Sequence, residues 1–272
     1  MTPDDSARPL ARRRWSPAAR YRRSLWLLTT RDLKVRYSTS ALGYLWSILD
    51  PLVMSAIYWF VFTQVFDREV GRPPYILFLL TALLSWMWFN GAVSDATRAF
   101  TREAKLIRST TIPRTIWVAR LVLSKGIEFV LAIPVLAIFF LANLSQGAEL
   151  HIEALWWLLA IPLQAALTLG VGLLVAPLVV FFRDLERAVK LALRFLFYAS
   201  PIIYGLHDLP EDLRMWGALN PLAGIFSLYR SAFFPDQFDA FAVLVSCGMT
   251  AVLLVVGYLV YRGSIRRVLK EI

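Results

Sequence analysis

Charged residues are scarce in this 272-residue sequence. Asp, Glu, Lys and Arg make up 18% of it, whereas 58% of its residues are hydrophobic. Soluble globular proteins carry about 25% charged residues. The apolar residues also come in runs of about 20, the length that crosses the hydrocarbon core of a bilayer as a helix. The composition therefore excludes an ordinary soluble domain and predicts an all-α integral membrane protein.

Residues that commonly carry catalysis or bind metals are also rare. The chain has one cysteine, Cys247, and two histidines, His151 and His207, too few for a disulfide framework or a thiolate or histidine metal site. It contains no Gly-x-x-x-x-Gly-Lys phosphate loop, no Gly-x-Ser-x-Gly elbow and no His-Glu-x-x-His. We therefore predict no catalytic residue and no metal site, and expect the energy for any transport to come from a partner or an ion gradient.

Positive charge is abundant but unevenly distributed. The 29 Lys and Arg exceed the 19 Asp and Glu, for a formal net charge of +10. Nucleic-acid binding needs cations clustered on a folded soluble face, but here they lie between apolar runs. Of the 29, 24 fall in alternate connections, at residues 1–43, 94–120, 183–194 and 262–272. The positive-inside rule then predicts that both termini are cytoplasmic, and we expect no nucleic-acid partner.

Six apolar segments are long enough to cross a membrane. They are Tyr44–Phe66, Ile76–Val93, Thr115–Leu141, Leu155–Phe182, Ala188–Leu206 and Ala240–Tyr261. We predict a six-span transmembrane domain over residues 44–261, a cytoplasmic tail at 1–16 and a cytoplasmic C-terminus at 262–272.

Residues 17–43 are too charged to span a bilayer. Tyr21, Leu25 and Leu28 recur at helical spacing, and arginines lie mostly off that stripe. This pattern predicts an amphipathic helix and elbow in the membrane interface, with Trp26 near the headgroups. The alternative is a solvated basic helix.

The segment from about 206 to 234 fits no span. Asn220-Pro221 and Arg230 interrupt its apolar stretch, which leaves too short an uncharged run to cross. We predict that it enters the outer leaflet and returns, because non-helical backbone at that depth must face protein or water. A simple interfacial loop is the alternative.

Two further groups of residues could carry function. Lys125 and Glu128, three residues apart on the third span, predict an intrahelical ion pair, with a proton relay as the alternative. The many aromatic residues of the first two spans could form interfacial belts or line a passage for sugar rings.

The connection between the second and third spans is the most suggestive segment outside the spans. Residues 101–108 predict a short charged helix with Leu106 and Ile107 as apolar contacts. We expect it to insert into a cytoplasmic partner, and an ordinary connecting loop is the alternative.

Several motifs together resemble a known family. They are Arg31-Asp-Leu-Lys-Val-Arg-Tyr37, Leu42-Gly-Tyr-Leu-Trp46, Pro51-Leu52, Arg183-Asp184, Ser200-Pro-Ile-Ile-Tyr204 and Leu219-Asn-Pro-Leu222, with Arg230 beyond. Over nearly the whole chain the sequence resembles the membrane subunit of ABC exporters for polysaccharides, which move O-antigen, teichoic acid, capsule or cell-wall galactan.

The resemblance implies an architecture and partners. It implies six spans, an N-terminal interface helix, a coupling helix at about 98–110 and two short re-entrant gate helices between spans five and six. It also implies a homodimer in the bacterial inner membrane, surrounded by membrane lipid and bound to a separate ATP-binding subunit. ATP and Mg would bind to that subunit, with no cofactor in this chain, and the cargo would be a polyprenyl-diphosphate-linked polysaccharide.

The resemblance also implies roles for individual residues. The coupling helix would present Arg102, Glu103, Lys105, Leu106, Ile107 and Arg108. The inner mouth, near the lipid diphosphate, would hold Arg31, Lys34, Arg36 and Tyr37. The channel would be lined by Tyr58, Trp59, Phe62, Trp86, Phe89 and Tyr198, and the outer gate would include Tyr204, Asn220, Pro221 and Arg230.

The polymer is left open by the sequence. A cell-wall galactan is the leading choice, with another lipid-linked glycan such as an O-antigen close behind. Two other classes of protein compete with the exporter: an ion-coupled transporter acting alone, and a membrane-embedded glycosyl or acyl transferase. The first needs an inverted repeat and paired intramembrane carboxylates, which we do not find, and the second needs acidic or histidine clusters at one membrane face.

Overall fold

The computed structural model describes residues 16–38, 43–61 and 71–272, which form helices and connections without a β-strand. Four of the helical segments are long and apolar enough to cross a membrane. They are α3 (Tyr75–Ala96), α5 (Ile116–Ala142), α6 (Trp157–Phe181) with the short turn Ile152–Trp156 before it, and α10 (Ala240–Glu271). These four correspond to the predicted second, third, fourth and sixth spans.

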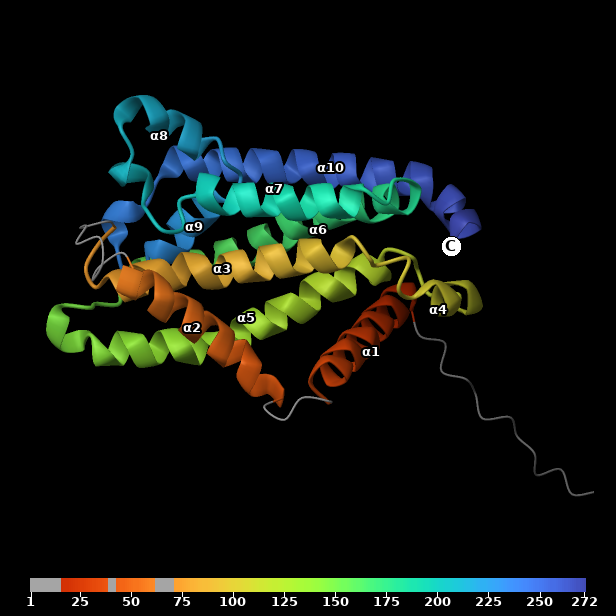
Figure 1. Ribbon diagram of the computed structural model, residues 1–272, viewed down its shortest axis with the longest axis horizontal. Helices are drawn as coiled ribbons and strands as arrows, with labels where there is room; N and C mark the ends of the chain where they lie inside the picture. The colour runs from red at the N-terminus through yellow and green to blue at the C-terminus, as the bar shows by residue number, and fades with distance from the viewer. Residues whose placement is uncertain (1–15, 39–42, 62–70) are drawn as a thin grey trace, which may run out of the picture.

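These four helices run roughly along the long axis of the molecule, and the shortest α-helices lie near its ends (Figure 1). Helix α4 (Ala104–Ser109) and the C-terminus lie at one end, which we name the α4 end. Helices α8 (Glu211–Ala218) and α9 (Ala223–Arg230) lie at the other, the α8 end. The predicted gate segment thus contains two short helices.

The predicted first and fifth spans correspond to shorter helices. Helix α2 (Trp46–Trp59) has 14 residues, and the last part of that predicted span, 62–66, lies outside the described residues. Helix α7 (Leu185–Ala199) has 15 residues and ends before Pro201, since proline lacks the N–H that would continue a helix. A span needs about 20 residues, so a count of six spans stays a prediction.

The sixth helix does not end where the apolar run ends. Helix α10 continues ten residues past Tyr261, to Glu271. Val268 is buried there, and Ile265 and Leu269 pack beside it against the core at the α4 end. Helix α10 therefore runs through the predicted boundary at residue 262, because the apolar positions beyond it recur at helical spacing. A cytoplasmic location of residues 262–272 stays a prediction.

The N-terminal helix α1 (Pro17–Ser38) carries the apolar stripe predicted for it, and its location in the membrane interface stays a prediction. Its stripe of Tyr21, Leu25 and Leu28 packs against the protein core at the α4 end. Helix α5 is its main neighbour. Trp26 is exposed, as an interfacial position requires.

Helix α3 is the centre of the bundle. Its residues from Tyr75 to Phe89 form the main core with α9 and with parts of α5, α6 and α7. Helices α6 and α10 form the most extensive pair. They can approach closely because a Cβ on Gly257 would lie 2.2 Å from the carbonyl oxygen of Gly170, and small residues permit such backbone contact between membrane helices.

Candidate functional site

Four charged side chains join three segments at the α4 end, and we name them the α1–α4 network. Arg31 and Asp32 come from α1, Glu103 directly precedes α4, and Arg120 lies in the first turns of α5. Arg120 forms an ion pair with Asp32, and Arg31 Nη2 lies 2.6 Å from Glu103 Oε1. Arg31 also contacts Asp32 at 3.0 Å, and Arg120 Nη2 lies 3.8 Å from Glu103. The network therefore attaches the turn before α4 to both α1 and α5.

Arg120 is the buried member of this network. Its side chain is 4% exposed and its guanidinium lies 5.2 Å from the centre of the Trp117 ring. A buried charge is tolerated only when opposite charges and hydrogen bonds compensate its lost hydration. For Arg31, burial alone would lower the pKa, but the hydrogen bond to Asp32 and the charge of Glu103 outweigh it and raise the pKa. The carboxylates thus favour the charged form of Arg31.

A second set of charges surrounds Arg36, which lies farther along α1. We name Arg36, Asp95, Lys125 and Glu128 the pocket network. Lys125 Nζ lies 2.6 Å from Glu128 Oε2, which confirms the predicted intrahelical pair. Arg36 of α1 joins it, with Nη1 2.6 Å from Glu128 Oε1 and Nη2 2.7 Å from Asp95 of α3. The sequence does not show that Arg36 and Asp95 join this pair, because neither residue lies within a predicted span.

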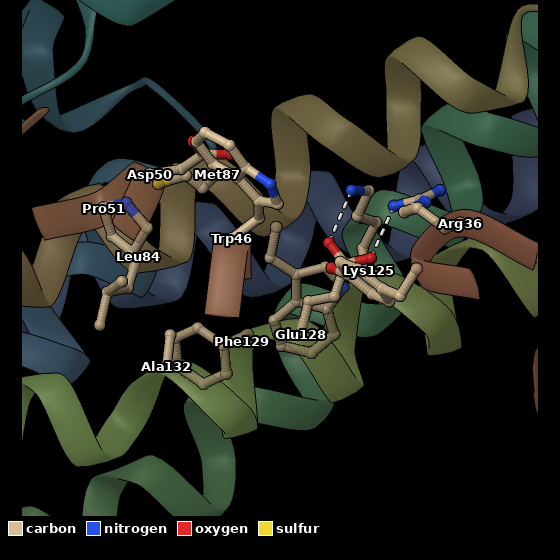
Figure 2. A pocket seen from close by; sticks show the side chains of 12 residues that line it. Arg36, Trp46, Asp50, Pro51, Leu84, Met87, Lys125, Glu128, Phe129 and Ala132 are labelled. Atoms are coloured by element: carbon tan, nitrogen blue, oxygen red, sulfur yellow. Dashed lines mark hydrogen bonds and ion pairs between the residues drawn. The ribbon is translucent and has the colours of Figure 1, made fainter. Parts of the chain in front are cut away.

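The pocket network closes one end of a cavity of about 330 Å³ between α1, α2, α3 and α5 (Figure 2). Figure 2 shows Arg36 and Lys125 converging on the Glu128 carboxylate. The other walls are apolar or aromatic, except for Asp50 of α2 and the Tyr37 hydroxyl. These walls include Trp46, Pro51, Leu84, Met87, Trp88, Phe129 and Ala132. Such a cavity combines flat apolar faces with a few convergent polar groups, as small-molecule sites do.

The four residues predicted at the inner mouth all lie on α1, but they are not equivalent. Arg31 and Arg36 each contact two carboxylates. Tyr37 lines the pocket, and Lys34 is exposed on α1. A diphosphate that binds to either arginine would have to compete with carboxylates already in place. Their role in diphosphate binding stays a prediction.

The predicted coupling helix is shorter and more firmly attached than expected. Helix α4 covers Ala104–Ser109, against a predicted range of about 98–110. Ile107 is completely buried and Leu106 is half-buried, and both pack into the protein's own core. The expectation that these two side chains serve as contacts for a partner is therefore wrong for Ile107. The cations Arg102, Lys105 and Arg108 are exposed.

At the α8 end, Arg230 differs from the other predicted gate residues because it is fully enclosed. It donates hydrogen bonds to the backbone carbonyls of Phe78 (3.2 Å), Pro201 (2.7 Å), Ile202 (2.5 Å) and Tyr204 (3.1 Å). Its guanidinium also stacks 3.7 Å from the centre of the Phe78 ring. In this conformation Arg230 does not face a passage, and it joins α9 to α3 and to the chain after α7.

The side chain of Asn220 also forms hydrogen bonds within the protein. Its side-chain oxygen accepts a hydrogen bond from the Leu222 N–H at 2.9 Å, and its amide donates to Ser200 Oγ at 2.8 Å. Pro221 follows, half-buried, and the Tyr204 hydroxyl donates to the Tyr198 carbonyl at 3.1 Å. These contacts hold the start of α9 against the end of α7, and a gating role for the segment stays a prediction.

The predicted channel aromatics fall into two groups. Trp86 and Phe89 are buried, with Trp86 5.6 Å from Phe197 between ring centres, because α3 is the central helix. They offer no exposed ring in this single chain. The others lie nearer the surface: Tyr58 stacks on Phe197, while Trp59 and Tyr198 are exposed. Phe62 lies outside the described residues.

The chain matches a family model over most of its length. The model of the ABC-2 type transporter matches residues 23–234, which include both charge networks and helix α9. The chain belongs to the ABC-2 type transporter family. Sequence reasoning missed Asp32, Asp95 and Arg120 in this ABC-2 transporter, although a cation near the start of an apolar span, such as Arg120, is a signal for a buried partner.

Several named permeases are similar to this ABC-2 transporter. It is 34% identical over 242 residues to the O-antigen export system permease protein RfbA of Klebsiella pneumoniae, covering 86% of this chain and 89% of that one. It is 28% identical to the RfbA protein of Myxococcus xanthus, covering 86% and 89%. It is 26% identical to the polysialic acid transport protein KpsM of Escherichia coli, covering 86% and 91%.

Proposed function

We propose that this ABC-2 transporter is the permease subunit of an exporter that moves a lipid-linked polysaccharide out of the bacterial cytoplasm. The observation that carries the proposal is the similarity to O-antigen export permeases along 86% of the chain. The KpsM protein of E. coli, named for polysialic acid transport, is similar over the same share. Transport, and not bond cleavage, is the activity proposed for this chain.

The α1–α4 network supports a role in coupling to an ATP-binding subunit. Because the chain has no phosphate loop, ATP and Mg would bind to a separate subunit, which would contact the exposed cations around α4. Glu103 links this region to Arg31 of α1 and Arg120 of α5. A movement of α4 would therefore be carried directly to α1 and α5.

The proposed orientation places the α4 end in the cytoplasm, with both termini, and the α8 end outside. Most Lys and Arg fall in connections that belong to the α4 end, in agreement with the positive-inside rule. In this arrangement α2 and α7 complete six spans, α8 and α9 form the outer gate, and two copies of the chain enclose the channel between them.

The proposed cargo is a polysaccharide attached to polyprenyl diphosphate. The exposed rings of Trp59 and Tyr198 would offer apolar faces to sugar rings in the channel. Among polymers, an O-antigen-like glycan has the support of the relatives' names, and cell-wall galactan remains the alternative. Lys34, the exposed cation of the predicted inner mouth, is the residue best placed to meet the diphosphate.

The first experiment tests the partner subunit. The chain is purified in detergent from its native host, and the eluate is assayed for a co-purifying protein with ATPase activity. A variant with Arg102→Glu, Lys105→Glu and Arg108→Glu should lose that protein. The matched control, Arg266→Glu with Arg267→Glu and Lys270→Glu, reverses three exposed cations near the same end of the molecule and should keep it.

The second experiment tests the cargo. Deleting the gene should make lipid-linked glycan accumulate on the cytoplasmic side of the membrane, and restoring the wild-type chain should reverse the accumulation. If the chain purifies without any ATPase and its loss leaves glycan export intact, the exporter proposal fails. An ion-coupled transporter or a membrane-embedded transferase would then be the candidates to pursue.

A further inference from the structure

An apolar groove opens on the surface of the bundle near the start of α1. It has a volume of about 400 Å³ and lies between α1, α5, α6 and α10. Its walls are Tyr21, Thr115, Ala119, Leu169, Leu173, Leu254, Val255 and Tyr258. Val255 and Tyr258 are exposed, so the groove is open to its surroundings along α10. The pocket network takes no part in it.

One end of the groove carries polar groups. The Tyr21 hydroxyl lies 3.3 Å from Thr115 Oγ1, and this pair joins α1 to the start of α5. Tyr258 lies on the same α10 face, one turn before Arg262. Tyrosines at such positions commonly mark the level of lipid headgroups, with the ring in the apolar region and the hydroxyl toward water.

The cations around this end contrast with those of the two networks. Arg20 and Arg22 flank Tyr21 and are exposed, as is Arg262. In the part of the chain that the structure describes, no ion pair involves any of these three arginines, whereas Arg31, Arg36 and Arg120 are all paired. The segments that form the groove contain no Asp or Glu between residues 16 and 30, 110 and 127, or 240 and 270. Among the described residues, the three arginines near this end of the groove therefore have no carboxylate partner.

We propose that this groove binds one acyl chain of an anionic phospholipid, whose phosphate is held by Arg20, Arg22 and Arg262. The apolar walls match a hydrocarbon chain, and the unpaired guanidinium groups match a phosphate. Basic pockets between membrane helices on the cytoplasmic side bind anionic headgroups in this way. Bound there, the lipid would connect α1 to α10 and so stabilise the position of the helix that carries both charge networks.

The proposal can be tested with the full chain alone, without cargo or an ATP-binding subunit, so its outcome is independent of the proposed function. The purified, delipidated protein is titrated with phosphatidylglycerol and with phosphatidylcholine of the same acyl chains, and bound lipid is counted by native mass spectrometry. We expect wild type to prefer phosphatidylglycerol at least about tenfold, because three cations near the phosphate each favour it.

Two variants and a control assign the preference to the groove. Changing Arg20, Arg22 and Arg262 to Gln should remove the preference between the two lipids. Changing Arg183, Arg187 and Arg194 to Gln removes three other exposed arginines and should leave the preference unchanged. Ala119→Phe, which fills the groove, should weaken the binding of both lipids.

Several results would overturn the proposal. One is equal binding of the two lipids to wild type, and another is an unchanged preference in the Arg20, Arg22 and Arg262 variant. Tighter, arginine-dependent binding of undecaprenyl phosphate would assign the groove to the carrier lipid instead. A loss of dimers in Ala119→Phe would assign it to a second copy of the chain.

Discussion

Each end of the molecule buries an arginine, but the groups that compensate its charge and accept its hydrogen bonds differ between the two ends. At the α4 end, Arg120 is paired with the carboxylates of Asp32 and Glu103, which belong to other segments. At the α8 end, Arg230 is surrounded by four backbone carbonyls. Carboxylates on side chains can be exchanged between neighbouring cations, whereas backbone carbonyls are fixed by the fold. The difference suggests that the α4 end is built to transmit movement and the α8 end to hold a shape.

The residues around Arg120 and Arg230 also differ in how far they are exposed to water. Arg31, Asp32 and Glu103 are all partly exposed, so water can assist when one ion pair is exchanged for another. Around Arg230, all eight residues of α9 are buried. If α9 belongs to a gate, it moves as a unit with the chain at 201–204 and not by rotating Arg230 into the channel.

The largest expected effect is at the α8 end. Arg230→Met would leave several buried carbonyls without a donor, at about 1–3 kcal/mol for each unsatisfied group. We expect the variant not to accumulate in the membrane, as measured by membrane-fraction immunoblotting. Arg72→Met, which removes an exposed ion pair with Asp236, is the matched control and should accumulate normally. Normal accumulation of Arg230→Met would contradict the structural role.

The next largest loss of stability is expected at the α4 end. Arg120→Met leaves Asp32 and Glu103 with only Arg31, and breaking a buried ion pair costs about 3–5 kcal/mol. Because Arg31 still compensates both carboxylates, we expect the lower end of that range and a protein that still accumulates. Thermal unfolding in detergent measures the loss.

Adding Asp32→Asn to Arg120→Met should recover part of that stability, since it removes the carboxylate that has lost its ion pair with Arg120 and leaves Arg31 to Glu103. If the double variant is less stable than Arg120→Met by the full effect of Asp32→Asn alone, the two residues are not coupled.

A smaller effect is expected in the pocket network. Glu128→Gln removes the charge that holds Arg36 and Lys125 together, but Arg36 keeps Asp95. We expect a loss of about 1–3 kcal/mol in the free energy of unfolding, typical of a weakened hydrogen bond to a charged group. The exposed Glu149→Gln should show no loss. Equal stability of the two variants would contradict the network.

The smallest effect is at an exposed contact. Hydrogen bonds from Arg98, and then from Lys190, lower the pKa of Glu186 to about 2. A lowered pKa in the folded state stabilises the fold above the ordinary carboxyl pKa of about 4.5, and this contribution is lost as the pH falls toward 2. The difference in melting temperature between wild type and Glu186→Gln should therefore be small at pH 7 and vanish at low pH. A difference that grows as the pH falls would contradict this sign.

Much of the fold follows from apolar runs, but its interior polar contacts do not. The runs that became α3, α5 and α6 could be located within a few residues because length and hydropathy define a span locally. The continuation of α10 past Tyr261 could be recognised only from the weak spacing of Ile265, Val268 and Leu269. Which face of α1 meets protein depends on tertiary packing, and no local pattern encodes that.

One contact of the candidate site could be predicted from the sequence, but the contacts between different helices could not. Lys125 and Glu128 could be paired from their spacing alone, because residues three apart share a helix face. Asp95 lies 59 residues from its partner Arg36, and Asp32 lies 88 residues from its partner Arg120. A single sequence does not show which residues so far apart are in contact. The same limitation made Ile107 look available to a partner, although it is part of the protein's own core.

We propose that Glu103, through its contacts with Arg31 and Arg120, transmits movement from α4 to α1 and α5. The most direct test is the amount of glycan exported per ATP hydrolysed by the complex with its ATP-binding subunit, compared between Glu103→Ala and the exposed control Glu271→Ala. We predict that Glu103→Ala still binds the subunit and hydrolyses ATP but exports several-fold less glycan per ATP, while the control matches wild type. An unchanged ratio in Glu103→Ala would contradict the claim.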